Sequence, residues 1–307
     1  MATHVIVGAG PVGSAVAQEL LDRGQHVRVV TRSGSGIDGV EPVAADAADA
    51  QRLTEITAGA QAVYNCVNPP YHRWQEVWPP ISAALLAAAE RNDAVLATTA
   101  NLYGYGPVSA PMTEQTPLAA TGTKGTVRNE MWREALAAHE AGRVRAFEVR
   151  GSDYLGGNSY LSTVITPAWR KGRTAWVPAA LDVPHTFTDV RDVATLLVTG
   201  VADERAWGRA WHVPSNDPVT LREVGATAAR QLGVANKVRS LPYAAVWAAG
   251  VVSPFLRELR ETQHQFRRPF VLDSTLAQQT FGLHPHEFTD SIAYDLEHGT
   301  PAPGSKN

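Results

Sequence analysis

The sequence predicts an α/β fold in which a doubly wound parallel sheet carries a smaller C-terminal lobe. Two observations support this prediction. Short apolar runs alternate with helical patterns over residues 3–149, which is the order of βαβ units in a parallel sheet. Over residues 169–218 prolines and tryptophans become frequent and this rhythm is lost. We therefore expect a sheet domain over residues 1–160, with residues 184–202 returning to it, and a lobe formed mainly by residues 161–307.

The individual elements follow from hydrophobic periodicity and from helix breakers. The predicted strands cover residues 4–7, 26–30, 62–65, 94–97, 144–149 and 209–213. The predicted helices cover residues 12–22, 47–57, 74–91, 125–141, 192–202, 221–232 and 243–260. We expect an interruption at Pro79 and Pro80 and a break at Ser253 and Pro254, because proline removes a helical hydrogen bond. The tail after Pro301 is rich in Pro, Gly and Ser and is predicted to be disordered.

Composition excludes several classes of protein. The 307 residues are 44% hydrophobic, which is enough for one large core or for a core and a smaller lobe. The formal net charge is -3 and no dense basic run occurs, so we expect no nucleic-acid partner. The single cysteine, Cys66, excludes an internal disulfide and a cysteine-rich zinc site. The closest histidine pair, His284 and His286, is separated by a proline and has no cysteine or clustered carboxylates nearby, so we expect no metal.

The N-terminal residues and the lengths of the apolar runs indicate where the protein is located. Residues 3–7 form a strand pattern directly, without a basic segment followed by a cleavable apolar stretch. The longest apolar runs, such as residues 81–89, are too short to span a bilayer. We therefore expect a cytoplasmic protein without a membrane partner.

A glycine-rich turn carries the strongest functional signal. Gly8, Gly10 and Gly13 lie between the first predicted strand and the first predicted helix. In this context the spacing is typical of a dinucleotide site, where the pyrophosphate meets the backbone and the helix N-terminus. We expect Pro11 and Val12, inside the turn, to contact the cofactor as well. The alternative is an ordinary glycine-rich turn of a Rossmann sheet.

The end of the second strand indicates which dinucleotide binds. NAD sites normally carry an acidic residue there for the ribose 2′-hydroxyl, but residues 25–37 contain none. Arg32 can pair instead with a 2′-phosphate, with Ser33 or Ser35 as hydrogen-bond donors. The sequence therefore predicts NADP(H). Asp46 is a candidate for the adenine edge, with a helix N-cap as its alternative role.

Several further segments resemble the extended short-chain dehydrogenase/reductase superfamily, in its NAD-dependent epimerase/dehydratase branch. The resemblance covers nearly the whole chain and adds to the glycine turn the segments 98–104, 111–117, 185–194 and 211–215. It implies a Rossmann domain with a substrate-binding lobe, a nicotinamide cofactor and a small-molecule substrate. Members of this family commonly pair through helices such as 74–91, so the resemblance also implies a homodimer.

In that family a Ser or Thr, a Tyr and a Lys form the catalytic set, and Tyr-x-x-x-Lys lies on one helix. Thr99 matches the hydroxyl position. By distance from Thr99, Lys124 occupies the tyrosine position and Arg128 the lysine position, and no Tyr-x-x-x-Lys occurs in the chain. The chain thus resembles an atypical member of the family.

Two interpretations of this replacement stay open. In the first, Lys124 and Arg128 face the nicotinamide and ribose, and repulsion between the two cations makes Lys124 neutral enough to act as an acid/base. In the second, the cofactor is kept while the usual alcohol chemistry is lost. Tyr103, Tyr105 or Tyr154 then supplies the hydroxyl, although Tyr103 can equally have a packing role.

The remaining candidates come from loops that the resemblance places beside the cofactor or substrate. Asn68 is expected to contact the cofactor. The residues expected to border the substrate are Tyr71, Tyr105, Asp153, Tyr154, Asn158 and His185. Tyr160 and Phe187 are expected near them, and His72 is expected to have a plain loop role. Asp153 can instead stabilise a turn, and His185 can be structural. The tryptophans, Trp169, Trp176, Trp207, Trp211 and Trp247 among them, are expected to pack in the core.

These predictions favour an NADP(H)-dependent oxidoreductase that reduces a small organic substrate such as an imine, an enone or a ketone. Without the tyrosine, substrates that need little help from an acid become attractive. One alternative is an epimerase, dehydratase or cyclase that uses the nicotinamide transiently or not at all. The other is an NADP(H)-binding sensor without catalysis.

Overall fold

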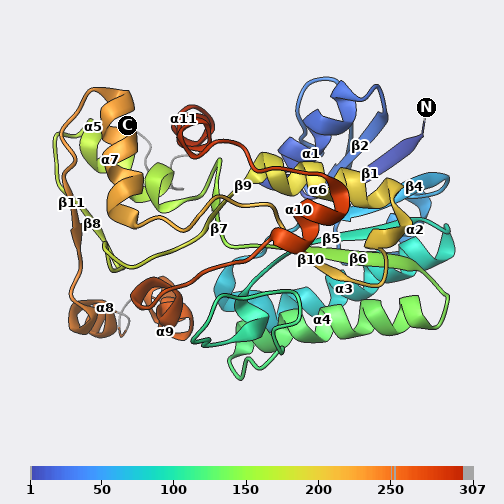
Figure 1. Ribbon diagram of the computed structural model, residues 1–307. Coiled ribbons are helices and arrows are strands. Elements are labelled where there is room, and N and C mark those ends of the chain that lie inside the picture. Colours follow the sequence, from blue (N-terminus) through green and yellow to red (C-terminus); the bar gives the residue numbers. More distant parts are fainter. Residues whose placement is uncertain (1, 250, 252–253, 300–307) are drawn as a thin grey trace.

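The computed structural model describes residues 2–249, 251 and 254–299. A large sheet with helices on both faces lies beside a smaller, mostly helical lobe (Figure 1). The tail after Pro301, predicted to be disordered, and the predicted break at Ser253 lie outside the described residues. Among the described residues, no helix has the length and apolar character needed to cross a membrane.

The large sheet has seven parallel strands in the order β10-β6-β5-β4-β1-β2-β3. Their bounds are β1 (Thr3–Val7), β2 (His26–Thr31), β3 (Glu41–Ala44), β4 (Ala60–Asn65), β5 (Val95–Asn101), β6 (Arg145–Gly151) and β10 (Ala210–His212). This arrangement confirms the doubly wound parallel sheet. The strand order reverses between β1 and β4, which is where such sheets open a ligand crevice at the carboxyl ends of their strands. β3 was not predicted, because it is a short, mostly exposed edge strand that contains Pro42.

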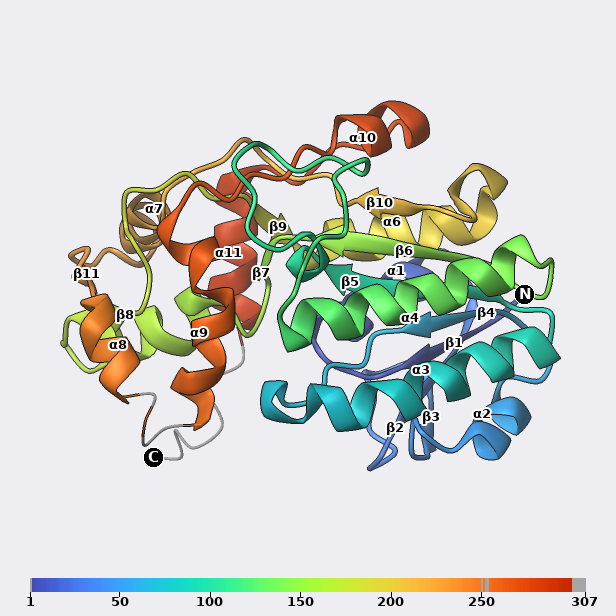
Figure 2. The same ribbon diagram turned by 90° about the horizontal axis from the view of Figure 1, so that it is seen from below.

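Helices cover both faces of this sheet (Figures 1 and 2). One face carries α1 (Pro11–Asp22) and α6 (Val190–Ala202), whose apolar residues share a core with Ile6 and Val149. The other face carries α2 (Ala50–Ile56), α3 (Trp74–Arg91) and α4 (Thr123–Glu140). α10 (Thr275–Phe281) packs beside β10. Short helices η1 (Tyr71–Arg73), η2 (Tyr103–Tyr105) and η4 (Glu204–Ala206) connect these elements.

The predicted interruption of α3 is wrong, because the helix runs unbroken through Pro79 and Pro80. Both prolines are exposed, so the carbonyls that lose an N–H partner lie on the side that faces water. Trp74 and Trp78 lie one turn apart on the opposite side and are fully buried, which holds the helix on the sheet. The homodimer expected through this helix stays a prediction.

The lobe contains two small parallel sheets and several helices around its own apolar core. Its elements are β7 (Asp153–Leu155), β8 (Ala175–Val177), β9 (Phe187–Asp189), β11 (Val238–Ser240), η3 (Leu161–Ile165), α5 (Thr166–Arg170), α7 (Leu221–Leu232), α8 (Tyr243–Ala249), α9 (Pro254–Arg267) and α11 (Phe288–His298). A capping box between Thr220 and Glu223 begins α7, and Gly233 ends it in a left-handed conformation. The predicted helix 243–260 is divided into α8 and α9, and Pro254 begins the second of them.

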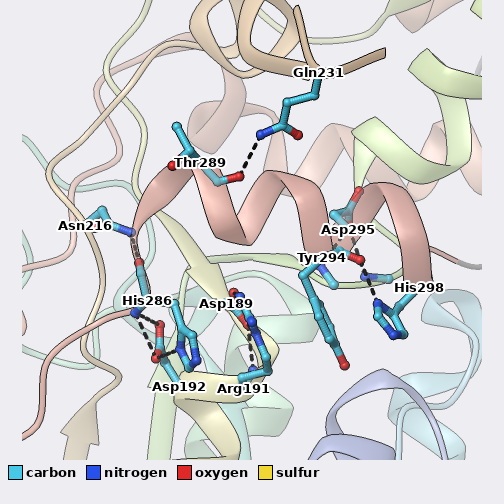
Figure 3. Close-up of polar contacts among 12 residues, drawn as sticks. Asp189, Arg191, Asp192, Asn216, Gln231, His286, Thr289, Tyr294, Asp295 and His298 are labelled. Carbon is cyan, nitrogen blue, oxygen red and sulfur yellow. Dashed lines mark hydrogen bonds and ion pairs between the residues drawn. The ribbon is translucent and has the colours of Figure 1, made fainter. Parts of the chain in front are cut away.

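Polar contacts fix α11 between the lobe and the sheet body (Figure 3). The imidazole Nδ1 of His286 lies 2.6 Å from Oδ1 of Asp192 on α6. At the other end of the helix, Asp295 accepts hydrogen bonds from the backbone N–H groups of Gly156 and Gly157. Burial raises the pKa of Asp192 to about 6. These contacts hold the loop after β7 in place, and that loop borders the site described next.

Candidate dinucleotide and substrate cleft

One large cavity, of about 1060 Å³, lies at the carboxyl ends of the parallel strands. It begins at the turn after β1, passes the ends of β2, β4, β5 and β6, and continues under the lobe to Phe270. Its volume is at the upper end of the range for ligand sites, so it has room for two molecules side by side. The predicted site residues that line it are Gly8, Gly10, Pro11, Val12, Arg32, Asp46, Asn68, Tyr71, Thr99, Tyr103, Arg128, Asp153, Tyr154 and Asn158.

The glycine turn is closed towards the protein and open towards the cavity. Gly8 has φ +103°, and a Cβ there would lie 2.6 Å from the carbonyl oxygen of Cys66. A Cβ on Gly13 would lie 1.9 Å from the carbonyl oxygen of Gly8, so helix and strand pack as tightly as glycine allows. A Cβ on Gly10 would meet no atom within 4 Å. The open side of Gly10 and the uncapped N-terminus of α1 fit the pyrophosphate of a dinucleotide.

The end of β2 forms the adenosine side of the cleft. Arg32 is exposed and lines the cavity, and no acidic residue follows β2 before Asp38. Ser33 lies outside the cavity lining, and its hydroxyl is 3.0 Å from that of Ser35. Asp46 lines the cavity and also accepts a hydrogen bond from the backbone N–H of Ala48, so both roles considered for it are compatible with its position.

Arg128 on α4 lines the cleft. Its guanidinium carbon lies 4.9 Å from the ring centroid of Trp74 and 4.3 Å from that of Trp78. Nη1 donates a hydrogen bond of 3.2 Å to the carbonyl oxygen of Thr99. Burial lowers the pKa of this arginine, and Nε has no hydrogen-bond partner among the described residues. The two rings and Thr99 therefore hold the guanidinium at the cavity wall. Its Nε remains able to donate a hydrogen bond to a ligand.

Lys124 points elsewhere. Its side chain is buried, and Nζ lies 3.2 Å from Oε2 of Glu261 on α9. The other carboxylate oxygen of Glu261 accepts a hydrogen bond of 2.7 Å from the backbone N–H of Lys124. Lys124 does not line the large cavity. The first interpretation requires repulsion from Arg128 to make Lys124 neutral. Glu261 instead places a negative charge beside Lys124 and directs the lysine towards the lobe.

Three of the predicted hydroxyl groups line the cavity. The hydroxyl oxygens of Tyr71 and Tyr103 lie 2.9 Å apart, and burial raises the pKa of both tyrosines. The hydroxyl of Tyr154 donates a hydrogen bond of 2.6 Å to the carbonyl oxygen of Ala100, and burial raises its pKa as well. These tyrosines are therefore protonated, and they already have hydrogen-bond partners.

Tyr105 lies outside the large cavity, contrary to the expectation that it borders the substrate. Its hydroxyl oxygen is 2.7 Å from Nε2 of His212 and accepts a hydrogen bond of 2.8 Å from Nη1 of Arg150. Arg150 is also paired with Glu148, and all four side chains are buried. The ring turns towards these partners because they satisfy its hydroxyl inside the core.

Asp153 and His185 form a pair at the lobe side of the cleft. Nε2 of His185 lies 3.0 Å from Oδ2 of Asp153, at an angle outside hydrogen-bond geometry. Asp153 lines the large cavity, whereas His185 lies behind it at a small adjoining cavity of about 20 Å³. The ring of His185 packs against Phe187, Phe266 and Phe270.

The lobe adds lining residues that sequence reasoning missed: Trp176, Pro178, Leu241, Thr262, Gln265, Phe266 and Phe270. They come from segments far apart in the chain and carry no motif. The spacing of Thr262, Gln265 and Phe266 on one side of α9 is the only available signal. Trp176 is 50% exposed and Trp247 52% exposed, so the expectation of core packing is wrong for these two, while Trp169 and Trp211 are buried as expected.

No group of three or more potential metal ligands occurs among the described residues. Cys66 lies at the cavity wall beside the hydroxyl of Thr99, at an Sγ to Oγ1 distance of 3.7 Å. Burial raises the pKa of its thiol to about 12, so it stays protonated and is a poor nucleophile.

Comparison with models of protein families shows to which family the chain belongs. A model of the NAD dependent epimerase/dehydratase family matches residues 4–211, from β1 to β10. The chain belongs to this family. Membership supports an oxidoreductase-type enzyme with a nicotinamide cofactor, as the glycine turn predicts. A search of curated proteins gives no match.

Solved structures share the fold over almost the whole chain. A dTDP-glucose 4,6-dehydratase from Bacillus anthracis in complex with NAD has a TM-score of 0.78 at 14% identity, covering 97% of this chain and 96% of that one. DesIV, the dTDP-glucose 4,6-dehydratase from Streptomyces venezuelae, has a TM-score of 0.77 at 17% identity, with 96% of each chain covered. A UDP-galactose 4-epimerase has a TM-score of 0.75 at 17% identity, covering 96% and 98%. At these identities the likeness establishes the Rossmann-like fold alone.

Proposed function

We propose that this protein is an NADP(H)-dependent oxidoreductase that reduces a small, non-anionic organic substrate such as a ketone, an enone or an imine. The observation that carries the proposal is the composition of the cavity wall. Among the residues that the structure describes, those that line the cavity from Gly151 onwards include no lysine and no arginine, and they are rich in aromatic side chains. The described cations that line the cavity, Arg32, Arg73 and Arg128, all come from the sheet body.

This wall disfavours a nucleoside-diphosphate sugar as the substrate. A diphosphate normally needs arginine or lysine partners, since charge-assisted hydrogen bonds replace its lost hydration. Trp176, Phe187, Phe266 and Phe270 instead offer apolar surface, and Asp153 is the one ionisable carboxylate of the lobe that lines the cavity within the described residues. Such surroundings suit a neutral or cationic molecule with an aromatic or aliphatic body.

The residues for the cofactor are those of the glycine turn and of the cleft centre. The backbone at Gly10 and the N-terminus of α1 would hold the pyrophosphate, and Arg128 beside Thr99 would hold the ribose next to the nicotinamide. When bound, the reduced nicotinamide supplies a hydride to an electrophilic carbon. The protein then has to orient that carbon, exclude water and provide a proton.

Arg32 supports NADP(H) in preference to NAD(H). It lines the adenosine side of the cleft, and no acidic residue follows β2 before Asp38, where NAD sites normally carry one. A guanidinium there can pair with a 2′-phosphate. Titration of the protein with NADPH and NADH, followed by nicotinamide fluorescence, tests this choice, and tighter binding of NADH would contradict it.

A spectrophotometric screen for NADPH oxidation across ketones, enones and imines tests the reductase proposal. Turnover of at least one class, with net consumption of NADPH, is the expected result. Tight NADPH binding without turnover of any class would count against it.

Family membership favours a second candidate, an epimerase or dehydratase that returns the nicotinamide to its starting state. The deciding measurement is the oxidation state of the bound nicotinamide before and after a complete turnover. Net oxidation supports the reductase, and full recovery supports the second candidate.

A further inference from the structure

We propose that the lobe side of the cleft binds a positively charged nitrogen of the substrate, with the carboxylate of Asp153 and the side-chain amide oxygen of Gln265 as its acceptors. This inference rests on the proposed reductase function and names its substrate class. Among ketones, enones and imines, the protonated imine is the class that carries such a nitrogen beside the carbon that is reduced. Asp153 and Gln265 are assigned here as substrate-binding residues.

Asp153 brings a negative charge to the carboxyl ends of the strands. It lies two residues beyond the end of β6, where Gly151 pairs with Asn101 at the end of β5. Its side chain is 29% exposed and lines both the large and the small cavity. Within the described residues its carboxylate accepts no hydrogen bond, and Nε2 of His185, 3.0 Å from Oδ2, lies outside hydrogen-bond geometry. The carboxylate can therefore accept hydrogen bonds from a ligand.

Gln265 supplies a second acceptor beside Asp153. The residue is 1% exposed, and neither Oε1 nor Nε2 of its amide has a hydrogen-bond partner among the described residues. It lines the same two cavities as Asp153, and the smaller of them has a volume of only about 20 Å³, so both residues border one confined space. A buried amide without partners destabilises the folded protein, and an N–H group of a ligand would satisfy its oxygen.

Aromatic rings surround these two residues. Tyr160, Phe187 and Phe266 line both cavities together with Asp153 and Gln265. The rings of Tyr160 and Phe266 meet edge to face at a centroid distance of 5.3 Å. The faces of such rings attract a cation and also cover its apolar body. A carboxylate set among aromatic rings is thus suited to an ammonium or iminium group.

The charges at the cavity wall are divided between its two sides. Among the described residues of the lobe, Asp153 is the one charged side chain that lines the large cavity. The lining arginines and the other lining carboxylates all belong to the sheet body: Arg32, Arg73, Arg128, Asp46 and Glu76. A cationic nitrogen is therefore attracted to the lobe side of the cleft and repelled by the arginines opposite.

The charge of Asp153 also acts across the cleft. It adds to burial in raising the pKa of Tyr71 in η1 and of Tyr103 in η2, both of which belong to the sheet body. It does the same to Tyr160 in the lobe. The carboxylate therefore lies close enough to both sides to act on a group that is bound between them.

A protonated imine can be reduced in this site without a proton from the protein. The carbon of the C=N bond receives a hydride from the reduced dinucleotide and forms a C–H bond. The electron pair of the C=N π bond moves to nitrogen, which loses its positive charge, so the products are a neutral amine and the oxidised dinucleotide. Asp153 stays a carboxylate throughout. Its negative charge beside the N–H group favours the protonated form of the imine, which is the form that accepts the hydride more readily.

Calorimetric titration with benzylammonium and benzyl alcohol tests the cation site without reference to turnover. The two probes have nearly the same size and differ in charge. Benzylammonium should bind at least about tenfold more tightly to the unaltered protein. Asp153→Asn should weaken its binding by a factor of about 10–100 and that of benzyl alcohol by less than about twofold. Absence of benzylammonium binding, or equal affinity for the two probes, overturns the proposal.

Kinetics test the selection of the substrate class. A cyclic imine should be reduced with a higher kcat/KM than the cyclic ketone of the same ring. Asp153→Asn should lower kcat/KM for the imine by a factor of about 10–100 and for the ketone by less than about twofold. Asp182→Asn, which alters an exposed aspartate of the lobe outside both cavities, is the matched control and should change neither. A higher kcat/KM for the ketone in the unaltered protein overturns the proposal.

The outcomes separate the two proposals. No turnover of any substrate by the unaltered protein speaks against the reductase function, whereas the titration still decides whether the lobe side binds a cation. Turnover of ketones alone leaves the reductase function standing and overturns the selection of an imine. Thermal unfolding of Asp153→Asn confirms that lost affinity is not lost folding.

Discussion

Lys124 on α4 and Glu261 on α9 join the sheet body to the lobe. The two charged atoms are 3.2 Å apart, the lysine side chain is 2% exposed and the glutamate side chain is 28% exposed. Glu261 also accepts a hydrogen bond from the backbone N–H at Lys124, so one carboxylate holds the first turn of α4 twice. The start of α4 is therefore fixed to α9 of the lobe through Lys124.

Glu261→Gln should destabilise the protein. It removes the negative charge beside a buried cation, and we expect a loss of about 1–3 kcal/mol, since the exposed side of the glutamate is partly screened by water. Urea unfolding gives the value. The control is Asp182→Asn, which breaks the exposed pair with Arg222 and should cost much less than Glu261→Gln, because water screens both charges. Equal losses in the two variants would contradict the special role of Glu261.

Arg32→Glu should separate the two dinucleotides. Loss of a charge-assisted contact with the 2′-phosphate should weaken NADPH binding by a factor of about 10–100, while NADH binding changes little. Fluorescence titration of both dinucleotides measures this difference. Arg52→Glu on the exposed surface of α2 is the control for a simple change of charge. Equal weakening for NADPH and NADH in Arg32→Glu would argue against a 2′-phosphate contact.

His212 makes the stability of the protein sensitive to pH. Burial lowers its pKa from 6.5 to about 4, so between these values the unfolded chain binds a proton that the folded protein does not. Its stabilising contribution is complete above pH 6.5 and is lost as the pH falls towards 4. The slope for one such group is at most about 1.4 kcal/mol per pH unit.

His212→Asn should therefore flatten the pH dependence of urea unfolding between pH 6.5 and 4. Asparagine can still donate to the carbonyl oxygen of Asp273, which is the partner of Nδ1 in the unaltered protein. Asp192, whose raised pKa of about 6 acts in the opposite direction in this window, is common to both proteins and cancels in the comparison. The exposed His284→Asn should leave the slope unchanged, and an unchanged slope in His212→Asn would refute the assignment.

The sequence was most informative where backbone geometry limits the choice of residue. The turn could be predicted because a side chain at Gly8 or Gly13 would lie within 3 Å of the backbone, and Gly8 also has a positive φ. The positions of the main strands along the chain followed from their hydrophobic periodicity. β3 could not be predicted in the same way, because an exposed edge strand of four residues carries almost no hydrophobic pattern.

Side-chain direction was harder to predict than position. Lys124 and Arg128 were placed correctly on one helix, but whether each meets the cleft depends on partners from other elements. Trp74 and Trp78 hold Arg128 at the cavity, and Glu261 draws Lys124 away from it. Such partners come together only when the lobe packs on the sheet, and no local pattern in the sequence encodes that contact.

Gln265 offers a test of the cleft that combines stability and function. It is 1% exposed, and neither atom of its amide has a hydrogen-bond partner among the described residues, although the residue lines both cavities. A buried amide without partners costs about 1–3 kcal/mol. Gln265→Leu keeps the size of the side chain and removes that cost, so it should raise the midpoint of urea unfolding.

The same variant should raise KM for the substrate. A buried amide without hydrogen-bond partners at the cavity wall destabilises the protein, and we expect it to be kept because it binds the substrate. Gln263→Leu is the matched control on the same helix, since Gln263 also has an unpartnered, buried Nε2 but does not line the cavity. It should gain stability without a change in KM. A Gln265→Leu variant that gains stability and keeps its KM would show that the amide takes no part in substrate binding.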